Sequence, residues 1–490
     1  MTNRTPLSEI VKAYDVRGLV GTQFDAGTAW ALGAAFAEEV TGAEPGVVTR
    51  IAIGYDMRPS SPELSGAFAR GAASRGLDVV VIGLCSTDGL YYASGSLDCP
   101  GAMFTASHNP AAYNGIKMCR AGARPIGQDT GLARIRDRAQ ELLDTKAEQA
   151  EQNADPAGAG PVGTISADDL LRGYAEHLRG LVDLSGVRPL KVVVDAGNGM
   201  GGLTTPAVLG TAAGLAALPL DVVPLYFELD GTFPNHEANP LEPENLRDLQ
   251  AAVVAAGADL GLAFDGDADR CFVVDERGEP VNPSAVTAMV ARREIAKETA
   301  AGRPARVIHN LISSRAVREV IEASGGTAVR TRVGHSFIKA TMAEQGAVFG
   351  GEHSAHYYFR DFWFADTGML AAMHVLAALG GQPLPLSQLA AEFQPYPTSG
   401  EINSRVTDVE AATARVEAAF AGRPGVETDR MDGLSVVHPG TAGAAGRDGM
   451  WWFNLRPSNT EPLLRLNAEA HDAPTMAALR DEVLALVRQA

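Results

Sequence analysis

The sequence predicts an α/β protein of three similar mixed α/β domains followed by a smaller α+β C-terminal domain, around a central active-site cleft. Three stretches, beginning near residues 51, 191 and 305, repeat one pattern: a β-branched apolar run, a polar loop, a helix-period segment and another apolar run. Strands that alternate with helical segments are typical of βαβ units and a mainly parallel sheet. The copies lie over a hundred residues apart, which indicates repeated domains and not a solenoid.

Each copy contains its own start and stop signals. The first begins with IAIGYD (51–56), has Pro62 where a first helical turn accepts proline and Gly76 where a helix ends, and closes with LDVVVIGL. The second has KVVVDAGNGMGG (191–202), an Ala-rich segment expected to be helical, and LDVVPLYFEL. The third has ARVIHNLISSRAVREVIEASGG (305–326) followed by TAVRTRVGH.

The joints between domains are marked by composition. Residues 151–166 are rich in Gly, Pro and Ala, 275–283 form a turn cluster, and 394–400 contain two prolines. The tail then has a strand, a helix, a hairpin about Asp432, two strands and a final helix to Ala490, which is α+β. The predicted domains are 1–162, 163–279, 280–396 and 397–490.

Composition and charge exclude several classes of protein. The 490 residues are 46% hydrophobic and 20% charged, close to ordinary globular usage, which excludes disordered and fibrous proteins. Lys and Arg number 41 and Asp and Glu 59, so the net charge of −18 argues against nucleic acid or an anionic membrane as partner. A small phosphorylated ligand needs only a local basic pocket and stays possible.

The sequence also predicts the compartment. Its four cysteines show no zinc-ligand spacing and are too few for a disulfide scaffold, which fits a reducing environment. The N-terminus has no apolar signal-peptide core, and glycines and prolines interrupt the uncharged run 367–391. We therefore expect a cytoplasmic protein.

The strongest local signal is DLGLAFDGDADRCFVVD, in which an apolar run ends in Asp265, Asp267 and Asp269. Three carboxylates in five residues repel one another unless a hard cation lies among them, and this density of oxygen ligands suits Mg²⁺. An EF-hand is excluded because Arg270 stands at its obligatory glycine position and because both flanks have strand patterns. An acidic surface turn is the alternative, against which the apolar flanks argue.

The second signal is GAMFTASHNPAAYNGIKM, a strand-like run that ends in a polar loop containing Ser107. By itself S-H-N-P is most typical of a turn or helix cap. The functional interpretation makes Ser107 a nucleophile that carries a phosphoryl group, which needs an activating neighbour and a cation. Lys117 offers an ammonium group near this loop. The chain around Ser107 has no G-x-S-x-G elbow, so an esterase-type triad is unsupported.

The third signal is GGEHSAHYYFRDFWFAD, where Glu352 and Ser354 are expected on one face of an extended segment. A carboxylate and a hydroxyl so placed can hydrogen-bond to vicinal sugar hydroxyls. Three nearby histidines, His335, His353 and His356, raise the alternative of zinc, but H-x-x-H without a third ligand at helix spacing is a weak signal. A structural role is expected for at least one of them.

The fourth signal is WWFNLRPSNTEPLLRL, in which a strand ends in Arg456 and a polar loop follows. An arginine, hydroxyl groups and exposed backbone N–H groups together form a phosphate nest, with a plain hairpin turn as the alternative. Near the N-terminus, AYDVRG places Tyr14 and Arg17 before a glycine, which is a weak signal alone.

Together these motifs resemble those of the α-D-phosphohexomutase family, in particular its phosphomannomutase/phosphoglucomutase group, whose members interconvert 1-phospho and 6-phospho sugars. The resemblance covers essentially the whole chain. The motifs T-A-S-H-N-P, D-G-D-A-D-R, G-E-H-S-A-H and R-P-S-N-T-E-P occur in the family's order, one from each of its four domains. The resemblance thus implies a phosphoserine loop in domain 1–162, a metal-binding loop in 163–279, a sugar-recognition loop in 280–396 and a phosphate-binding loop in 397–490.

The resemblance implies a role for each residue that matches a family motif. The implied catalytic residues are Ser107 as phosphate carrier, Lys117 as general acid or base, Arg17 near the reactive phosphate, and His335 as a further proton-transfer group. The implied Mg²⁺ ligands are Asp265, Asp267, Asp269 and the phosphate on Ser107. The implied substrate-binding residues are Tyr14, His108, Arg270, Gly334, Glu352, Ser354, His356, Arg456, Ser458, Asn459 and Thr460.

The same resemblance implies the reaction. O1 and O6 of a hexose are too far apart for one displacement, so the phosphoserine phosphorylates the free end and the bisphosphorylated sugar turns round before it returns its other phosphate. The cofactors implied are Mg²⁺ and a hexose 1,6-bisphosphate, and the partner is a hexose phosphate. The C-terminal domain is expected to close over the other three and exclude water. The sequence leaves the oligomeric state open.

Substrate preference depends on a few positions. Asn459 and His356 match the family's phosphomannomutases, whereas His353 and Ala355 depart from their common Met and Gly. Ile312 stands where some dual-specificity members have a lysine that contacts the substrate. We expect a phosphomannomutase with phosphoglucomutase activity; a mainly glucose-specific enzyme is the alternative.

Two other classes of protein stay open from the sequence. An aspartate-nucleophile phosphatase would use Asp265 to carry phosphate and would leave Ser107 dispensable. A non-catalytic sugar-phosphate-binding protein would use the same loops without turnover.

Overall fold

The chain forms two compact units. The computed structural model describes residues 6–43, 46–151, 162–440, 448–457 and 463–489. The first unit contains Met1–Val281 and Ser354–Ser387, and the second contains Asn282–His353 and Gln388–Ala490. The segment Ser354–Ser387, which the sequence assigns to the third domain, is thus part of the first unit.

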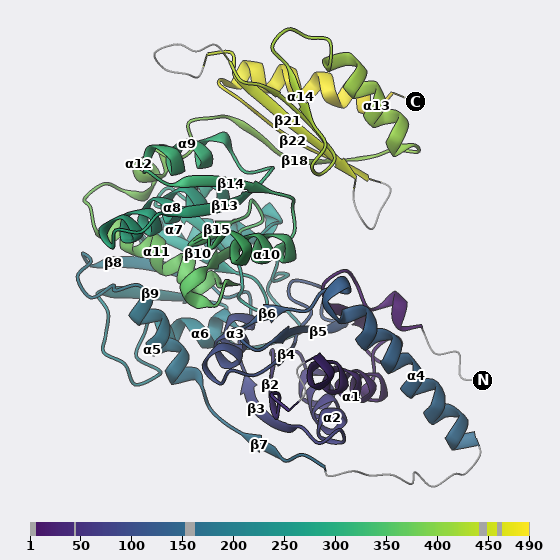
Figure 1. Cartoon of the computed structure of the whole chain (residues 1–490). Coiled ribbons are helices and arrows are strands. Elements are labelled where there is room, and N and C mark those ends of the chain that lie inside the picture. Colours follow the sequence, from purple (N-terminus) through teal and green to yellow (C-terminus); the bar gives the residue numbers. More distant parts are fainter. Residues whose placement is uncertain (1–5, 44–45, 152–161, 441–447, 458–462, 490) are drawn as a thin grey trace. The chain divides into compact units, whose positions relative to one another are not determined.

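The first unit begins with a seven-stranded sheet in the order β1-β5-β4-β2-β3-β7, with β6 paired to β5 (Figure 1). Its strands are β1 Val16–Leu19, β2 Arg50–Tyr55, β3 Asp78–Leu84, β4 Gly101–Phe104, β5 Tyr113–Arg120, β6 Arg124–Pro125 and β7 Ile165–Ala167. The helices are α1 Ala26–Ala43, α2 Ser61–Ala73, α3 Thr87–Ser96 and α4 Leu132–Glu151. Strands β2, β3, β4 and β7 are parallel, whereas β5 is antiparallel to β4 and β1.

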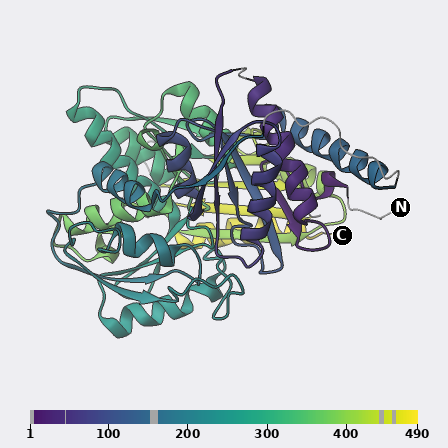
Figure 2. The ribbon, with the colours of Figure 1, turned by 90° about the horizontal axis from the view of Figure 1, so that it is seen from below.

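Helices cover both faces of this sheet because its buried strands are apolar on both sides. Ile51 and Ile53 pack into the core formed with α1, α2 and α4, whereas Ala52 between them packs toward α3 on the other face. Ser86 caps α3 by accepting a hydrogen bond from the Gly89 N–H at 3.2 Å. Beside α1, the C-terminal part of α4 projects from the domain (Figures 1 and 2).

The first unit contains a second, five-stranded sheet in the order β12-β11-β10-β8-β9. Its strands are β8 Leu190–Asp195, β9 Leu220–Leu225, β10 Leu260–Phe264, β11 Cys271–Asp275 and β12 Pro280–Val281. The helices of this domain are α5 Leu171–Leu181, α6 Gly201–Val208 and α7 Arg247–Ala256. The segment Ser354–Ser387 supplies the antiparallel pair β16 Tyr357–Phe359 and β17 Ala365–Asp366, and α11 Gly368–Gly380, which packs on β11.

The Ala-rich segment after β8 is less helical than the sequence predicted. Helix α6 ends at Val208, and residues 209–219 form turns and extended chain. Gly210 and Gly214 lie in this stretch, and Gly214 has a φ of +71°, which favours glycine.

The second unit contains a parallel sheet and an antiparallel sheet. The parallel strands are β13 Arg306–Asn310, flanked by β14 Thr327–Thr331 and β15 Phe349–Gly351. The accompanying helices are α8 Pro283–Ala300, α9 Arg315–Ala323, α10 His335–Gln345 and α12 Leu386–Ala391, the last of which begins at the end of the first unit. The C-terminal sheet has the order β18-β22-β21-β20-β19, and its strands are β18 Thr398–Arg405, β19 Glu427–Asp429, β20 Leu434–His438, β21 Trp451–Pro457 and β22 Leu463–Ala470.

Two helices, α13 Val409–Phe420 and α14 Ala473–Val487, complete this C-terminal domain. Their buried residues Val416, Phe420 and Val483 pack against Phe453 of β21, and all four are fully buried. The observed architecture confirms the predicted α/β fold class with a smaller α+β C-terminal domain.

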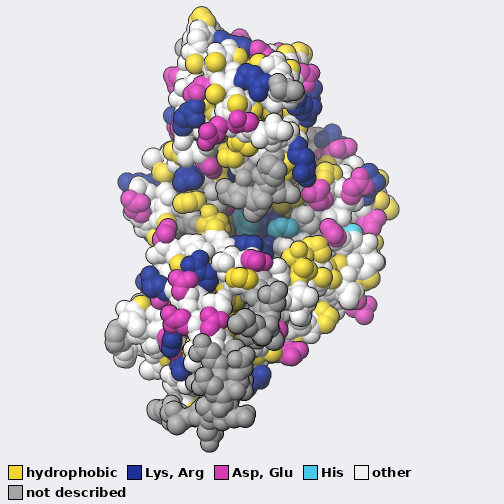
Figure 3. Space-filling view, turned by 90° about the vertical axis from the view of Figure 1, so that its right-hand side faces the viewer, with side chains coloured by type: hydrophobic (Ala, Val, Ile, Leu, Met, Phe, Trp, Pro, Cys, Tyr) yellow, Lys and Arg dark blue, Asp and Glu magenta, His cyan; other side chains and the backbone are white. Residues whose placement is uncertain are grey.

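Two surface properties bear on function. Among the described residues, no helix combines the length and the apolar composition that crossing a membrane requires. On the face drawn in Figure 3, acidic and basic side chains are interspersed.

Candidate functional site

The loop after β4 places Ser107 against the loop after β10. Ser107 has a φ of +50°, a conformation uncommon for residues other than glycine, and only 3% of its surface is exposed. Its backbone N–H donates to Thr105 Oγ1 at 2.9 Å, and its Oγ donates to Asp265 Oδ2 at 2.9 Å. The hydroxyl group of the predicted nucleophile is therefore held beside the predicted metal loop.

The three predicted metal ligands lie together in the turn between two buried strands. Asp265, Asp267 and Asp269 are each at most 1% exposed, and their ligand atoms lie within 4.8 Å of one another. Strands β10 and β11 flank the acidic turn, which agrees with the strand patterns that excluded an EF-hand. Gly266 permits this close approach, because a Cβ there would stand 2.5 Å from the Ser107 carbonyl oxygen.

Two cationic side chains face these carboxylates. Lys117 Nζ lies 2.6 Å from Asp267 Oδ2 and 2.5 Å from Asp269 Oδ2. Arg270 donates to Asp265 Oδ2 from Nη2 at 2.8 Å and from Nε at 3.0 Å. Lys117 and Arg270 thus compensate two of the three negative charges of the cluster.

The buried charges shift one another's pKa values. Burial raises the pKa of Asp265 to about 7, although the neighbouring Arg270 opposes the shift. Burial acts in the same direction on Asp267, but the Lys117 ammonium outweighs it and holds the pKa of Asp267 below its ordinary value. Burial alone would lower the pKa of Lys117, but Asp267 and Asp269 raise it above its ordinary value, so the lysine carries a proton at neutral pH.

The cluster fits a hard divalent cation. Lys117 occupies one oxygen of Asp267 and one of Asp269, whereas Oδ1 of each is buried and accepts no hydrogen bond within the described part of the chain. A buried carboxylate oxygen without a partner is costly, and a cation would satisfy it. Carboxylate oxygens are the ligands that Mg²⁺ prefers.

His108 and Arg17 also border the Ser107 loop. His108 Nδ1 lies 3.2 Å from Ser107 Oγ and 2.5 Å from Arg270 Nη2. Burial and then Arg270 lower the pKa of His108 to about 2, so its Nδ1 accepts the arginine's hydrogen. Arg17 donates from Nη1 to Asn109 Oδ1 at 2.5 Å, and Tyr14 lies half-buried in the bend before Arg17.

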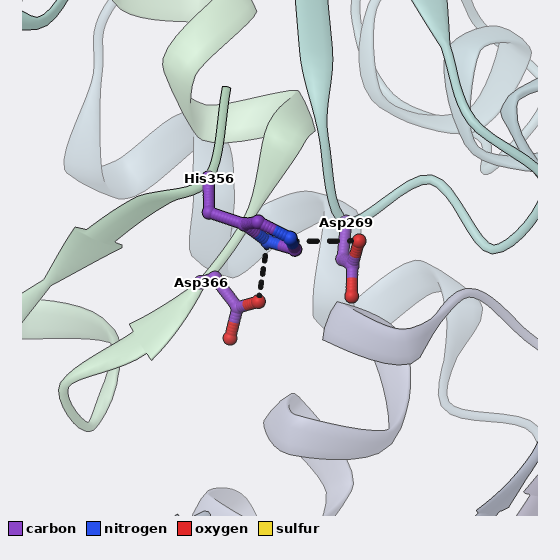
Figure 4. Close-up of side chains that lie close together, drawn as sticks. All are labelled: Asp269, His356 and Asp366. Carbon is purple, nitrogen blue, oxygen red and sulfur yellow. Dashed lines mark hydrogen bonds and ion pairs between the residues drawn. The ribbon is translucent and has the colours of Figure 1, made fainter. Parts of the chain in front are cut away.

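His356 approaches the aspartate cluster from the segment before β16 (Figure 4). Its Nδ1 lies 3.1 Å from Asp366 Oδ2 and 3.8 Å from Asp269 Oδ1. Burial alone would lower the pKa of His356, but Asp269 and Asp366 raise it above its ordinary value. Asp366 was not predicted from the sequence; the signal that could have revealed it is an acidic residue in a short strand directly after the aromatic run.

Thr87 and Asp88, the first two residues of α3, were not predicted from the sequence and lie close to the aspartate cluster. Thr87 Oγ1 donates to Asp267 Oδ2 at 2.6 Å, and its backbone N–H donates to the Asp267 carbonyl at 3.0 Å. Asp88 is buried and accepts hydrogen bonds from Tyr174 at 2.8 Å and Thr367 at 2.6 Å, and burial raises its pKa to about 6. The S-T-D triplet of a helix cap was their only sequence signal.

The remaining predicted residues belong largely to the second unit. Glu352 is 2% exposed, and Gly334 precedes α10 with a φ of +130°. His335 is the first residue of α10. Residues 353–354 form a turn and Ala355 is left-handed, with a φ of +64°, so the expected extended segment is wrong. Ser354 belongs to the first unit and Glu352 to the second.

Arg456 lies in a cationic cross-strand pair in the second unit. It stands directly opposite Arg465 on β22, and Glu401 accepts a hydrogen bond from Arg456 at 2.8 Å and from Arg465 at 3.3 Å. Nε of each arginine is buried without a partner among the residues described. Two guanidinium groups facing one carboxylate leave a positive charge for an anion. The predicted Ser458, Asn459 and Thr460 lie outside the described residues.

Comparisons with known proteins cover nearly the whole chain. The models for phosphoglucomutase/phosphomannomutase alpha/beta/alpha domains I, II and III match residues 8–145, 172–278 and 282–396, and the model for the C-terminal domain matches 401–486. The phosphomannomutase of Salmonella typhimurium is 38% identical over 481 residues, which are 98% of each chain. A relative from Xanthomonas campestris described as phosphohexose mutases is 39% identical, over 97% of this chain and 98% of its own.

A solved structure agrees with these matches. The phosphoglucomutase/phosphomannomutase family protein of Burkholderia thailandensis superposes with a TM-score of 0.82 at 29% identity, over 98% of this chain and 97% of that one. All four domain models match this protein in order, and relatives above one-third identity span its whole length. The protein therefore belongs to the phosphoglucomutase/phosphomannomutase family, whose members are phosphohexose-isomerising enzymes.

Proposed function

We propose that the protein is a phosphomannomutase that interconverts mannose 1-phosphate and mannose 6-phosphate, with phosphoglucomutase activity alongside. The observation that carries this proposal is Ser107, whose Oγ lies 2.9 Å from Asp265 in a buried site that also contains two cationic side chains. Phosphoryl transfer requires a positioned acceptor and compensation of negative charge, and this site supplies both.

The reaction proposed has two matched halves. The phosphoryl group on Ser107 Oγ passes to the free hydroxyl of the hexose phosphate: the bond from phosphorus to Oγ breaks, and the bond to the sugar oxygen forms. The resulting hexose 1,6-bisphosphate turns round and returns its other phosphoryl group to Ser107. Arg270 Nη2, 3.5 Å from Ser107 Oγ, faces the charge that develops on the transferred group.

Asp265, Asp267 and Asp269 would hold Mg²⁺ together with the phosphate on Ser107. When bound, Mg²⁺ supplies charge neutralisation at the phosphoryl oxygens. Thr87 keeps Asp267 in place by its hydrogen bond to Oδ2.

Proton transfer needs groups that hold a proton next to the reacting oxygens. Lys117 and His356 both carry raised pKa values and both contact Asp269. We assign Lys117 to protonate the Ser107 oxygen as it leaves, and the predicted proton-transfer residue His335 to accept the proton that the sugar hydroxyl loses as its oxygen bonds to phosphorus. In the return half both proton transfers run in reverse. Asp366 orients His356, a second proton-carrying group, and His335 stays a predicted proton-transfer residue.

The non-reacting phosphate would bind in the C-terminal domain. Arg456 supplies the predicted contact, and its cross-strand neighbour Arg465 adds a second guanidinium group. Glu352 and Ser354 are proposed to recognise the sugar hydroxyls.

The preference for mannose has separate support. The relatives from Salmonella typhimurium and Escherichia coli K12 are named phosphomannomutases, at 38% and 37% identity. Ile312, at the position where some dual-specificity members have lysine, is buried and borders a small cavity of about 10 Å³ beside His353.

We expect kcat/KM for mannose 1-phosphate to exceed that for glucose 1-phosphate. Steady-state assays with both sugars, Mg²⁺ and the matching 1,6-bisphosphate measure the ratio, and a reversed ratio would make the enzyme mainly a phosphoglucomutase.

Ser107→Ala tests the phosphate carrier. After incubation with hexose 1,6-bisphosphate we expect the wild type to gain one phosphoryl group on the Ser107 peptide, and Ser107→Ala to gain none and to lose about three orders of magnitude in kcat. Ser65→Ala is the matched control, because this buried serine bonds only to the Pro62 carbonyl among the contacts described. Phosphate on Asp265, with Ser107→Ala fully active, would instead identify an aspartate-nucleophile phosphatase.

Lys117→Met tests the cation site. Removing one partner from a buried ion cluster costs about 3–5 kcal/mol, so in EDTA we expect this variant to unfold at a lower temperature than the wild type. Added Mg²⁺ should recover part of the loss, because it replaces the missing positive charge. Thermal unfolding with and without Mg²⁺ measures this. The control is Arg120→Met on the same strand, which breaks the ion pair with Glu39 and keeps the aspartate cluster, so Mg²⁺ should stabilise it by no more than it stabilises the wild type. A Lys117→Met protein insensitive to Mg²⁺ would contradict the assigned cation site.

Arg456→Ala tests the distal phosphate contact. A charge-assisted hydrogen bond contributes about 1.5–3 kcal/mol, so we expect KM for mannose 1-phosphate to rise by one to two orders of magnitude. Arg405→Ala, an exposed arginine of the same domain, should keep the wild-type KM. An unchanged KM in Arg456→Ala would refute the assignment.

A further inference from the structure

Arg58 is a buried arginine with no role in the site described so far. It lies in the loop between β2 and α2, and its side chain has no exposed surface. A guanidinium group has five N–H donors in a fixed planar arrangement, and burying it without acceptors would be very costly. Arg58 must therefore satisfy all five within the protein.

Four of the five donors go to backbone carbonyls, three in the loop that carries Ser107 and one at the first residue of β5, where this loop ends. Nη2 donates to the carbonyls of Ser107 at 2.9 Å and Asn109 at 2.7 Å. Nη1 donates to those of Pro110 and Tyr113, both at 2.9 Å. The remaining donor, Nε, bonds to Asp56 Oδ2 at 3.2 Å. One side chain thus holds the loop at four points.

The surroundings hold Arg58 itself in place. Asp56 Oδ1 accepts from the Arg58 backbone N–H at 3.0 Å and from Ser61 Oγ at 2.7 Å. Phe233, from the second domain of the same unit, lies with its ring 5.2 Å from the guanidinium carbon. Gly231 leaves no space beside Arg58, because a Cβ there would stand 2.5 Å from the Arg58 Cα. The guanidinium group is therefore fixed before any substrate binds.

The loop needs such a partner. Between β4 and β5 the chain leaves the ladder, so the carbonyls of Ser107 and Asn109 lack the strand partners that they would have inside the sheet. Ser107 also has a φ of +50°, which costs free energy and persists only where the surroundings impose it. The contacts of Arg58 with Ser107 and Asn109 lie on both sides of His108 and impose this conformation.

We propose that Arg58 is a positioning residue for phosphoryl transfer, which acts by holding the carbonyls of the Ser107 loop and so sets where Ser107 Oγ lies relative to Asp265. The proposal rests on the proposed role of Ser107 as phosphate carrier. Arginine is required because a lysine ammonium has three donors and no planar arrangement, and cannot serve five acceptors.

Arg58→Lys in the full-length chain tests the proposal, because it keeps the charge and removes donors. We expect kcat with mannose 1-phosphate to fall about 100-fold, the usual effect of a displacement near 1 Å at a reacting group. KM should stay within about threefold, since the substrate contacts are untouched. Hydrogen exchange of backbone amides in 105–114 should become at least about tenfold faster, while β2 and α2 keep their wild-type protection.

Arg179→Lys is the matched control. Arg179 also donates to three backbone carbonyls, those of Val208, Gly210 and Ala216, in the second domain. Its loss should destabilise that region and leave kcat, KM and the exchange of 105–114 unchanged. If Arg58 were purely structural, Arg58→Lys would likewise lower stability and leave kcat and KM unchanged.

The outcomes separate cleanly. A kcat within about threefold of wild type, or faster exchange spread equally over β2 and α2, would overturn the proposal. If the wild type itself turned over no hexose phosphate, the proposed function would fail, whereas the exchange of 105–114 would still decide whether Arg58 holds the loop. If Arg58→Lys does not fold, Asp56→Asn replaces it. The amide removes the ion pair with Nε and keeps one oxygen for the Arg58 backbone N–H and Ser61 Oγ, so we expect the same changes at smaller size; wild-type kcat and exchange would overturn the proposal.

Discussion

The rest of the site depends on three negative charges that are buried within five residues. Asp265, Asp267 and Asp269 repel one another in a medium of low dielectric constant, so the protein must bring positive charge to them. Lys117 and Arg270 supply part of it and leave one negative charge uncompensated. A divalent cation would change the net charge of the site from negative to positive. A phosphate dianion needs a positive charge there in order to bind.

The side chains around this cluster come from distant parts of the chain. Lys117 projects from β5, Thr87 begins α3, and Arg58 precedes α2, yet each contacts one of the two loops that hold the acidic residues and the serine. Two of these contacts are with side chains and one is with backbone carbonyls. The geometry of the centre is therefore determined by several elements at once, which is what rigid positioning for phosphoryl transfer requires.

Much of this could be predicted from the sequence because the signals were local. Strand runs that end in D-G-D-A-D-R, T-A-S-H-N-P and R-P-S-N-T predict the metal, serine and anion loops when they occur together in this order, whereas each of the last two alone is also typical of a plain turn. Thr87 and Arg58 were not predictable, because their partners Asp267 and Ser107 lie far away along the chain and a helix-cap threonine or a loop arginine is usually exposed. Asp366 lies only ten residues from His356 and had a local signal, the short strand after the aromatic run. The turn at 353–354 was misjudged because Ala355 adopts a left-handed conformation that alanine rarely does.

Because Arg58 contacts carbonyl oxygens, it recognises the path of the loop and not the identity of its side chains. Every residue type has a carbonyl, so substitutions at Pro110 or at its exposed neighbours 111 and 112 preserve these four acceptors. An insertion or deletion of a single residue would instead displace at least one acceptor from the fixed guanidinium plane. Over evolutionary time this loop should thus tolerate drift in composition while its length remains invariant.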